Sequence, residues 1–136
     1  MEKILGLDVG DRTIGVAVSD ALGFTAQGVE TIFRKSKKED FQRLEELIKA
    51  YGINTVVAGL PKNMNGSLGP QGEKTKAFCE KLKNKFDVKV IYWDERLSTK
   101  AARRTLIEAD VSRKKRKGVI DKMAAVHILQ GYLDSL

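Results

Sequence analysis

The sequence predicts an α/β fold: a mixed five-stranded sheet with helices on both faces. Two observations predict it. Three strand-like segments follow one another with short connections within the first 33 residues, and helix-like segments alternate with strand-like ones from there to residue 93. Short connections favour antiparallel pairing of the first three strands. A helix between two strands implies a right-handed crossover and parallel pairing of the last two, so helices must cover both faces.

We predict a single domain over residues 1–136, since 42% of the chain is hydrophobic and can supply a core. No apolar run is long enough to span a membrane, and no signal-peptide pattern opens the chain. The one cysteine, Cys79, excludes an internal disulfide framework, and we expect it to be a packed core thiol. These features predict a cytoplasmic protein with no membrane partner. The formal charge of +7 and the pI of about 9.5 favour polyanionic partners.

The first predicted strand ends in a carboxylate. Residues 4–8 read Ile-Leu-Gly-Leu-Asp, an apolar run typical of a central strand buried on both faces. Asp8 places a charge where the strand emerges, and a half-buried carboxylate is costly without a cation, a donor or a metal. Gly10 permits a tight turn or the close approach of a ligand. The alternative is that Asp8 only caps a turn.

The next segments are predicted from alternation and capping patterns. Residues 13–19 alternate between larger and smaller side chains and predict a second strand, and turn residues then lead to a third strand at 25–33. Ser36 opens a Ser-x-x-Glu capping pattern, and apolar residues follow at helical spacing until Gly52. Residues 54–59, which are β-branched at their centre, predict a fourth strand.

The segment at 60–70 predicts a structured loop. It holds both prolines of the chain and the turn-forming residues Asn65, Gly66 and Gly69. It also follows a parallel strand, where α/β folds place ligand sites. A plain connector is the alternative, and the length of the loop counts against it. A second helix is predicted at 72–86.

The C-terminal third contains the remaining elements. We predict a fifth strand at 88–93, a third helix from Ser98, and a last helix at 120–133 that follows Gly118. The fifth strand ends in Trp93, for which we expect core packing because an indole buries a large area. Stacking on an unpaired base is the alternative.

An acidic residue lies on the apolar stripe of this last helix. Counting back three and four positions from two neighbouring alanines places Asp121 on the packed face, at the first turn. A helix-dipole contact, worth less than about 1 kcal/mol, accounts for an Asp near a helix start but not for one on the buried stripe. The stripe comprises Ala124, Ala125, Ile128, Leu129 and Tyr132.

Acidic positions from three segments can meet at one edge of this sheet: Asp8, Asp121, and either Asp94 or Glu95. Alternation leaves Asp94 and Glu95 both open, since they point to opposite faces. Crowded carboxylates repel one another, and their oxygens suit Mg²⁺ or Mn²⁺. Two such ions form a clamp for phosphodiester cleavage. There is no Cys/His zinc pattern, and we expect His127 to be a surface or packing residue because it lies off the Asp121 stripe.

A basic run precedes the predicted last helix. Residues 113–117 read Arg-Lys-Lys-Arg-Lys. We expect this run to be flexible when free and to grip the phosphates of a nucleic acid, which positions the nucleic acid without reading its sequence. Solvated, mobile surface is the alternative.

Four stretches of the chain form an ordered set. They are Leu7-Asp8-Val9-Gly10 with Arg12-Thr13-Ile14-Gly15, then Gly59-Leu60-Pro61-Lys62-Asn63-Met64-Asn65-Gly66-Ser67, then Asp94-Glu95-Arg96-Leu97-Ser98-Thr99, and last Ile120-Asp121-Lys122-Met123-Ala124-Ala125 with Ile128-Leu129-Gln130 and Tyr132-Leu133. Together they resemble the YqgF (RuvX) family, described as pre-16S rRNA nucleases or Holliday-junction-resolvase-like proteins. The likeness spans nearly the whole chain.

The resemblance implies an RNase H-like fold, in agreement with the element order. It also implies a metal-ion nuclease in which Asp8, Glu95 and Asp121 are the catalytic carboxylates and hold two Mg²⁺ or Mn²⁺ ions, so it favours Glu95 over Asp94 by analogy. Basic and polar residues in the four stretches and in the basic run are candidate nucleic-acid contacts: Arg12, Lys62, Asn63, Arg96, Arg113, Lys114, Lys115, Arg116 and Lys117.

The leading interpretation is a cytoplasmic Mg²⁺- or Mn²⁺-dependent endonuclease that acts on precursor ribosomal RNA, with ribosomal particles as further partners. A second is the resolution of branched DNA by the same residues, which needs a two-fold dimer; the oligomeric state stays open. A third is a non-catalytic RNA-binding factor in ribosome assembly. A fourth, nucleotide binding, ranks lowest because the actin-like ATPases with a similar Asp8-Val9-Gly10 stretch need two lobes, and this chain supplies one.

Overall fold

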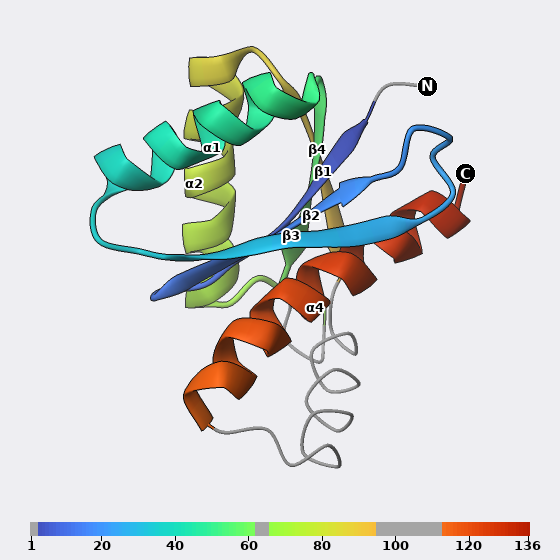
Figure 1. The fold of residues 1–136 in the computed structure, drawn as a ribbon. Coiled ribbons are helices and arrows are strands. Elements are labelled where there is room, and N and C mark those ends of the chain that lie inside the picture. Colours follow the sequence, from blue (N-terminus) through green and yellow to red (C-terminus); the bar gives the residue numbers. More distant parts are fainter. Residues whose placement is uncertain (1–2, 62–65, 95–112) are drawn as a thin grey trace.

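The structure, a computed structural model, describes residues 3–61, 66–94 and 113–136, the last stretch with side chains from Lys122 onward. Figure 1 shows one twisted sheet between two layers of helices. The elements in chain order are β1 (Ile4–Val9), β2 (Thr13–Ser19), β3 (Ala26–Phe33), α1 (Lys37–Tyr51), β4 (Thr55–Leu60), α2 (Pro70–Phe86), β5 (Lys89–Asp94) and α4 (Arg113–Asp134).

The sheet has the predicted mixed pairing. Its strand order is β3-β2-β1-β4-β5, with antiparallel pairing of β1 to β2 and of β2 to β3. Strand β4 pairs in parallel with both β1 and β5. All five predicted strands are confirmed, each with bounds within one residue. Strand β1 is therefore the centre of the sheet, as its continuous apolar run indicates.

Helices α1 and α2 cover one face of the sheet (Figure 1). Helix α1 begins as predicted, because the Ser36 hydroxyl accepts a hydrogen bond from the Glu39 amide at 3.2 Å, and it ends at Gly52 with a left-handed φ of 64°. Cys79 of α2 is fully buried in this core, and burial raises the pKa of its thiol to about 12. The larger core cluster lies on this face and includes Leu5, Leu7, Val9, Phe41, Leu44, Phe78 and Leu82.

Helix α4 covers the other face (Figure 1). It packs closely on β1, since a Cβ built on Gly6 would lie 2.8 Å from the Leu129 Cβ. Trp93 is half-buried here and meets the Tyr132 ring edge-on at 6.0 Å, which agrees with the expectation of core packing. His127 is exposed, as expected. The buried cluster on this face comprises Ile4, Ala17, Val57, Ala125, Ile128, Leu129 and Leu133.

The prediction that the last helix begins at Ile120 is wrong. Helix α4 begins at Arg113, so the basic run at 113–117 is helical rather than a flexible segment, and Gly118 lies inside the helix. Arg and Lys are good helix formers, whereas one interior glycine costs only about 1 kcal/mol relative to alanine. The third helix expected from Ser98 lies outside the described residues. None of the described helices is long and apolar enough to cross a membrane.

Candidate functional site

Asp8 lies on the α4 face of the central strand. Leu5, Leu7 and Val9 belong to the core under α1 and α2, whereas Ile4 packs in the α4 cluster. Successive side chains of a strand alternate between faces, so Asp8 shares a face with Ile4 and with the glycine that α4 touches. Asp8 is half-buried. A carboxylate therefore stands near the end of β1, on the side that α4 covers.

Helix α4 runs antiparallel to β1. Strand β3 is parallel to β1, since each pairs in antiparallel fashion with β2. On β3 the Ala26 amide donates to the Gln130 Oε1 at 2.9 Å, and a Cβ built on Gly28 would lie 2.9 Å from the Lys122 Cγ. Residue numbers therefore fall along α4 as they rise along β3 and β1.

This register brings position 121 to the level of Asp8. A Cβ on Gly6 would lie 3.1 Å from the Ala125 carbonyl oxygen. From Gly6 to Asp8 the strand advances about 6.6 Å, and from Ala125 back to Asp121 the helix advances about 6 Å. Two of the predicted acidic positions thus come from β1 and α4 to the same end of the sheet.

The sequence predicts Asp121 in the first turn of its helix, and this prediction is wrong. Asp121 is the ninth residue of α4, which begins at Arg113. Helix-dipole effects fall off within the first turn, so a dipole contact no longer offers an alternative role for Asp121.

The face of Asp94 is decided by its neighbours on β5. Ile91 and Trp93 pack against the α4 cluster, whereas Val90 and Tyr92 pack against the core under α1 and α2. Asp94 follows Tyr92 by two residues and so belongs to the face opposite Asp8. This alternation disfavours Asp94 as a partner of Asp8, a choice that the sequence alone left open.

The structure describes only part of the predicted set of acidic residues. Glu95 lies outside the described residues, and the side chain of Asp121 is not among those described, so Asp8 is the one member whose surroundings are known. Within residues 3–61, 66–94 and 122–136, no three His, Cys, Asp or Glu side chains are grouped closely enough to hold a metal ion.

The predicted nucleic-acid contacts fall into three groups. Arg12 is exposed in the turn between β1 and β2. Lys62, Asn63 and Arg96 lie outside the described residues. The third group, Arg113, Lys114, Lys115, Arg116 and Lys117, forms the start of α4.

The start of α4 projects past the strand ends. Ala125 lies at Gly6, and Lys117 precedes Ala125 by eight residues, which is about 12 Å of helix. Strand β1 ends three residues after Gly6, at Val9, which is about 10 Å of strand. Figure 1 shows this end of α4 extending beyond the sheet. The basic run is therefore at the same edge as Asp8 and beyond it.

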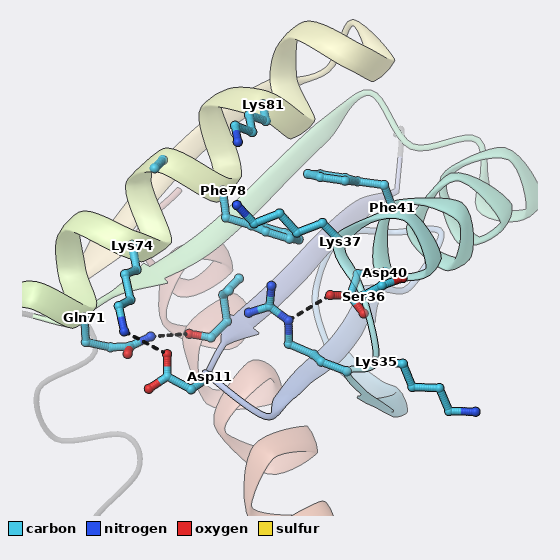
Figure 2. Close-up of a pocket in the computed structure, with 13 residues that line it drawn as sticks. Asp11, Lys35, Ser36, Lys37, Asp40, Phe41, Gln71, Lys74, Phe78 and Lys81 are labelled. Carbon is cyan, nitrogen blue, oxygen red and sulfur yellow. Dashed lines mark hydrogen bonds and ion pairs between the residues drawn. The ribbon is translucent and has the colours of Figure 1, made fainter.

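Sequence reasoning missed the pair that holds the turn after Asp8. Arg34 donates from Nε to the Asp40 Oδ2 at 2.8 Å and from Nη1 to the Gly10 carbonyl oxygen at 2.7 Å. Figure 2 shows the Arg34–Asp40 contact as a dashed line. Asp40 is only 2% exposed. It precedes Leu44 by one turn on the apolar stripe of α1, which is the same signal that singled out Asp121, so the pattern could have found it.

The chain is similar to known proteins over nearly its whole length. The family model described as "RuvX: Holliday junction resolvase" matches residues 2–135. A protein of Clostridioides difficile (strain 630) is 64% identical over 132 residues, covering 97% of this chain and 94% of that protein. One from Clostridium novyi (strain NT) is 60% identical over 134 residues, covering 98% and 99%. Both carry the name "Putative pre-16S rRNA nuclease".

Solved structures share the fold at low sequence identity. T. thermophilus RuvC in complex with a Holliday junction substrate superposes with a TM-score of 0.62 at 12% identity, covering 99% of this chain and 95% of that one. The fowlpox virus resolvase in complex with Holliday junction DNA gives 0.61 at 14% identity, covering 98% and 97%. The RNase H-like fold implied by the resemblance is thereby confirmed.

Proposed function

Because this chain belongs to the RuvX family, we propose that it is a metal-dependent endonuclease that cleaves precursor 16S rRNA in the cytoplasm. Asp8, Glu95 and Asp121 are the proposed catalytic carboxylates. One observation carries the proposal: the close packing of α4 on Gly6 brings positions 8 and 121 to one level at the carboxyl end of β1. The name that both relatives carry favours RNA as the substrate.

The donor set fits a hard divalent cation. Asp8 offers carboxylate oxygens in a half-buried position, and all three proposed ligands are carboxylates, which suit Mg²⁺ or Mn²⁺ rather than zinc. When bound, two such ions would activate a water molecule and stabilise the leaving oxygen of the cleaved phosphodiester.

The protein's own contribution is to hold Asp8 rigidly. Asp8 stands on the central strand, and hydrogen bonds fix the two residues that follow it. The Gln71 side chain donates from Nε2 to the Val9 carbonyl oxygen at 3.2 Å, and Arg34 holds the Gly10 carbonyl oxygen at 2.7 Å. A carboxylate on such a supported strand end keeps its position when substrate binds.

The start of α4 is the proposed substrate-binding element. Five basic residues at 113–117 extend past the strand ends on the element that also carries Asp121. Phosphate contacts there would orient the strand and offset its repulsion by the carboxylates without reading sequence. Arg12, Lys62, Asn63 and Arg96 are proposed as further contacts. Ribosomal particles, which carry the precursor, are proposed as further partners.

A second candidate is the resolution of branched DNA. The description of the family model and the substrates of the two solved complexes favour it. Symmetric cleavage of a four-way junction requires two active sites related by a two-fold axis, so this candidate requires a dimer at working concentration.

The test is a cleavage assay on three substrates: precursor 16S rRNA, single-stranded RNA and a four-way DNA junction, each with Mn²⁺ or with EDTA. We expect cleavage of the precursor that EDTA abolishes. Preferred cleavage of the junction by a dimer would replace the RNA assignment by the second candidate.

Substitutions test the residues. Asp8→Asn, Glu95→Gln and Asp121→Asn should each abolish cleavage, whereas Asp94→Asn, on the other face, and Asp134→Asn, at the far end of α4, should retain it. Removing one of several crowded charges should leave the metal-free melting temperature unchanged or higher. Full activity of Asp8→Asn, with contaminating nucleases controlled, would contradict the proposed chemistry.

A further inference from the structure

A concave site lies on the sheet face opposite α4. It is a pocket of about 510 Å³ between the start of α1, residues 71–81 of α2 and the β1–β2 turn (Figure 2). This volume is within the usual range of small-molecule sites, about 300–1,000 Å³. Its lining includes five cationic side chains and two carboxylates, which gives it an excess of positive charge.

The two carboxylates do not neutralise this excess. Asp40 forms a salt bridge with Arg34 at 2.8 Å and is almost fully buried. Asp11 lies 3.5 Å from Lys74, and both side chains are about two-thirds exposed, so that pair contributes little. The remaining lining cations are therefore not matched by the acidic groups of the pocket.

Two of these cations approach the pocket from opposite sides. In Figure 2 the Lys37 side chain extends from α1 across the pocket toward α2, and Lys81 projects from α2 toward it, while Lys35 turns away. Neither Lys37 nor Lys81 makes a salt bridge within the part of the chain that the structure describes. Two like charges from separate helices that face one cavity favour an anion between them.

The aromatic residues of the pocket exclude base stacking as its mode of recognition. The Phe78 ring stacks on Phe41 with centroids 4.8 Å apart and planes 9° from parallel. The Arg34 guanidinium also lies over the Phe78 ring, with its Cζ 5.1 Å from the centroid. The ring of Phe78 is thus occupied by protein, and the groups left for a ligand are cationic donors.

The chemistry of these donors fits a phosphate group. Among contacts within the described residues, the Arg34 side chain donates from Nε and Nη1, and a guanidinium carries five N–H donors, so others are left there for an anion. Lysine ammonium groups and a guanidinium together match the several acceptor oxygens of a phosphate. Ser36 and Lys37 line the pocket at the start of α1, where the helix dipole adds positive potential.

We propose that this pocket is a phosphate-binding site, distinct from the carboxylate site. Binding of its ligand requires no cleavage of nucleic acid. Its ligand is a phosphate ester, supplied either by a free phosphate compound such as a nucleotide or by the backbone of a nucleic-acid strand.

The proposal is tested by nuclear magnetic resonance of the ¹⁵N-labelled full chain, titrated with inorganic phosphate at constant ionic strength and with EDTA present. The pocket variant is Lys37→Gln with Lys81→Gln. The matched control, Lys38→Gln with Lys83→Gln, removes the same charge from the same helices at exposed positions outside the pocket. We expect saturable changes of amide chemical shift at the start of α1 and along α2. The affinity for phosphate should be at least five-fold weaker in the pocket variant and unchanged in the control.

Equal weakening in both variants, or shifts that never saturate, would overturn the proposal in favour of general charge attraction. A competition arm then identifies the source. Displacement of phosphate by single-stranded RNA without terminal phosphates assigns the site to a nucleic-acid strand. Displacement by adenosine monophosphate alone assigns it to a free phosphate compound, and displacement by neither overturns the proposal. Because EDTA suppresses metal-dependent cleavage, these readouts stand apart from the proposed nuclease function.

Discussion

The two faces of the sheet are built in different ways. Under α1 and α2 the contacts are made by large side chains, among them the fully buried Leu7 and Leu44. Under α4 the helix approaches the strands at glycines: a Cβ on Gly6 would lie 2.8 Å from Leu129, and one on Gly28 would lie 2.9 Å from Lys122. Side-chain volume thus fills the first face, where α2 comes close to the backbone at Gly72, whose Cβ would lie 2.7 Å from the Pro61 carbonyl oxygen. On the second face, backbone proximity sets the distance between β1 and α4, and so the surroundings of Asp8.

The sharpest test of this contrast compares neighbouring residues of β1. Leu7→Ala should lower the free energy of unfolding by about 2–5 kcal/mol, because it leaves a cavity under α1 and α2. Gly6→Ala should cost less, about 1–3 kcal/mol, through overpacking against Leu129. Denaturant unfolding of the two variants measures both values.

The loss of cleavage rate should be larger for Gly6→Ala than for Leu7→Ala, the opposite order to the loss of stability. At a temperature where both are folded, Leu7→Ala should keep most of the cleavage rate, whereas Gly6→Ala should lose at least ten-fold because α4 is displaced from Asp8. A displacement of about 1 Å at a catalytic group is enough for losses of that size. Full activity of Gly6→Ala would show that the spacing of α4 does not set the geometry of the site.

Trp93 tests whether the α4 face also contributes to stability. The indole is half-buried and packs on Tyr132 and Gly131. Trp93→Ala should therefore cost about 2 kcal/mol of unfolding free energy, below the roughly 3–5 kcal/mol of a fully buried aromatic residue. RNA affinity, measured with Ca²⁺ in place of Mg²⁺, should stay within about two-fold. An unchanged melting temperature with weakened RNA binding would instead identify a base-stacking residue.

The local elements were predictable from the sequence because their signals are local. Alternation and β-branching placed the strands within a residue, and the Ser36 and Gly52 caps bounded α1. The start of α4 was misplaced because Gly118 was interpreted as a helix boundary, although the basic residues before it favour a helix. That error placed Asp121 in a first turn.

The parts of the site that could not be predicted depend on contacts between distant segments. The choice between Asp94 and Glu95 depends on which face of β5 packs against α4. That face is set by the contact of Trp93 with Tyr132, 39 residues later in the chain. The Arg34–Asp40 pair has no periodic signal on the arginine side, since Arg34 follows a strand and precedes a helix cap. The pocket over Phe78 likewise unites residues of α1, α2 and a turn.

The helical state of the basic run changes the salt dependence expected of RNA binding. Five consecutive residues at 100° intervals cover more than one full turn, so only two or three can face one strand of phosphates. Replacing residues 113–117 with Gln should therefore flatten the slope of log affinity against log salt by about 1.4–2 units, where five contacts would give about 3.5. Fluorescence anisotropy from 50 to 300 mM salt measures this slope.

The control for the basic run changes Lys76 and Lys83 of α2, both exposed, to Gln. The slope should then change by less than about half a unit, since each phosphate contact contributes about 0.7. An unchanged slope in the 113–117 variant would mean that the run is only solvated surface. A change near 3.5 units would mean that α4 unwinds at its start when RNA binds.

The smallest expected effect concerns the thiol in the α1–α2 core. Burial raises the pKa of Cys79 from 9.0 to about 12, and Glu80 adds to the rise. The folded state thus favours the neutral thiol, so the stability from this group is complete below pH 9 and is lost as the pH rises toward 12. Between pH 8 and pH 10 the loss is about 1.4 kcal/mol.

Cys79→Ala removes this titration. The variant should be less stable at pH 8 because it leaves a small cavity, but its unfolding free energy should fall less between pH 8 and pH 10 than that of the parent protein. The range stops at pH 10 because burial, together with a hydrogen bond to Glu80, also raises the pKa of Tyr92, and Tyr92 would contribute above that pH. Parallel curves for the two proteins would show that the thiol is not held neutral by the core. A steeper fall in the variant would mean that α2 has lost packing around Phe78, and the large-side-chain face would then be less rigid than the contrast with α4 requires.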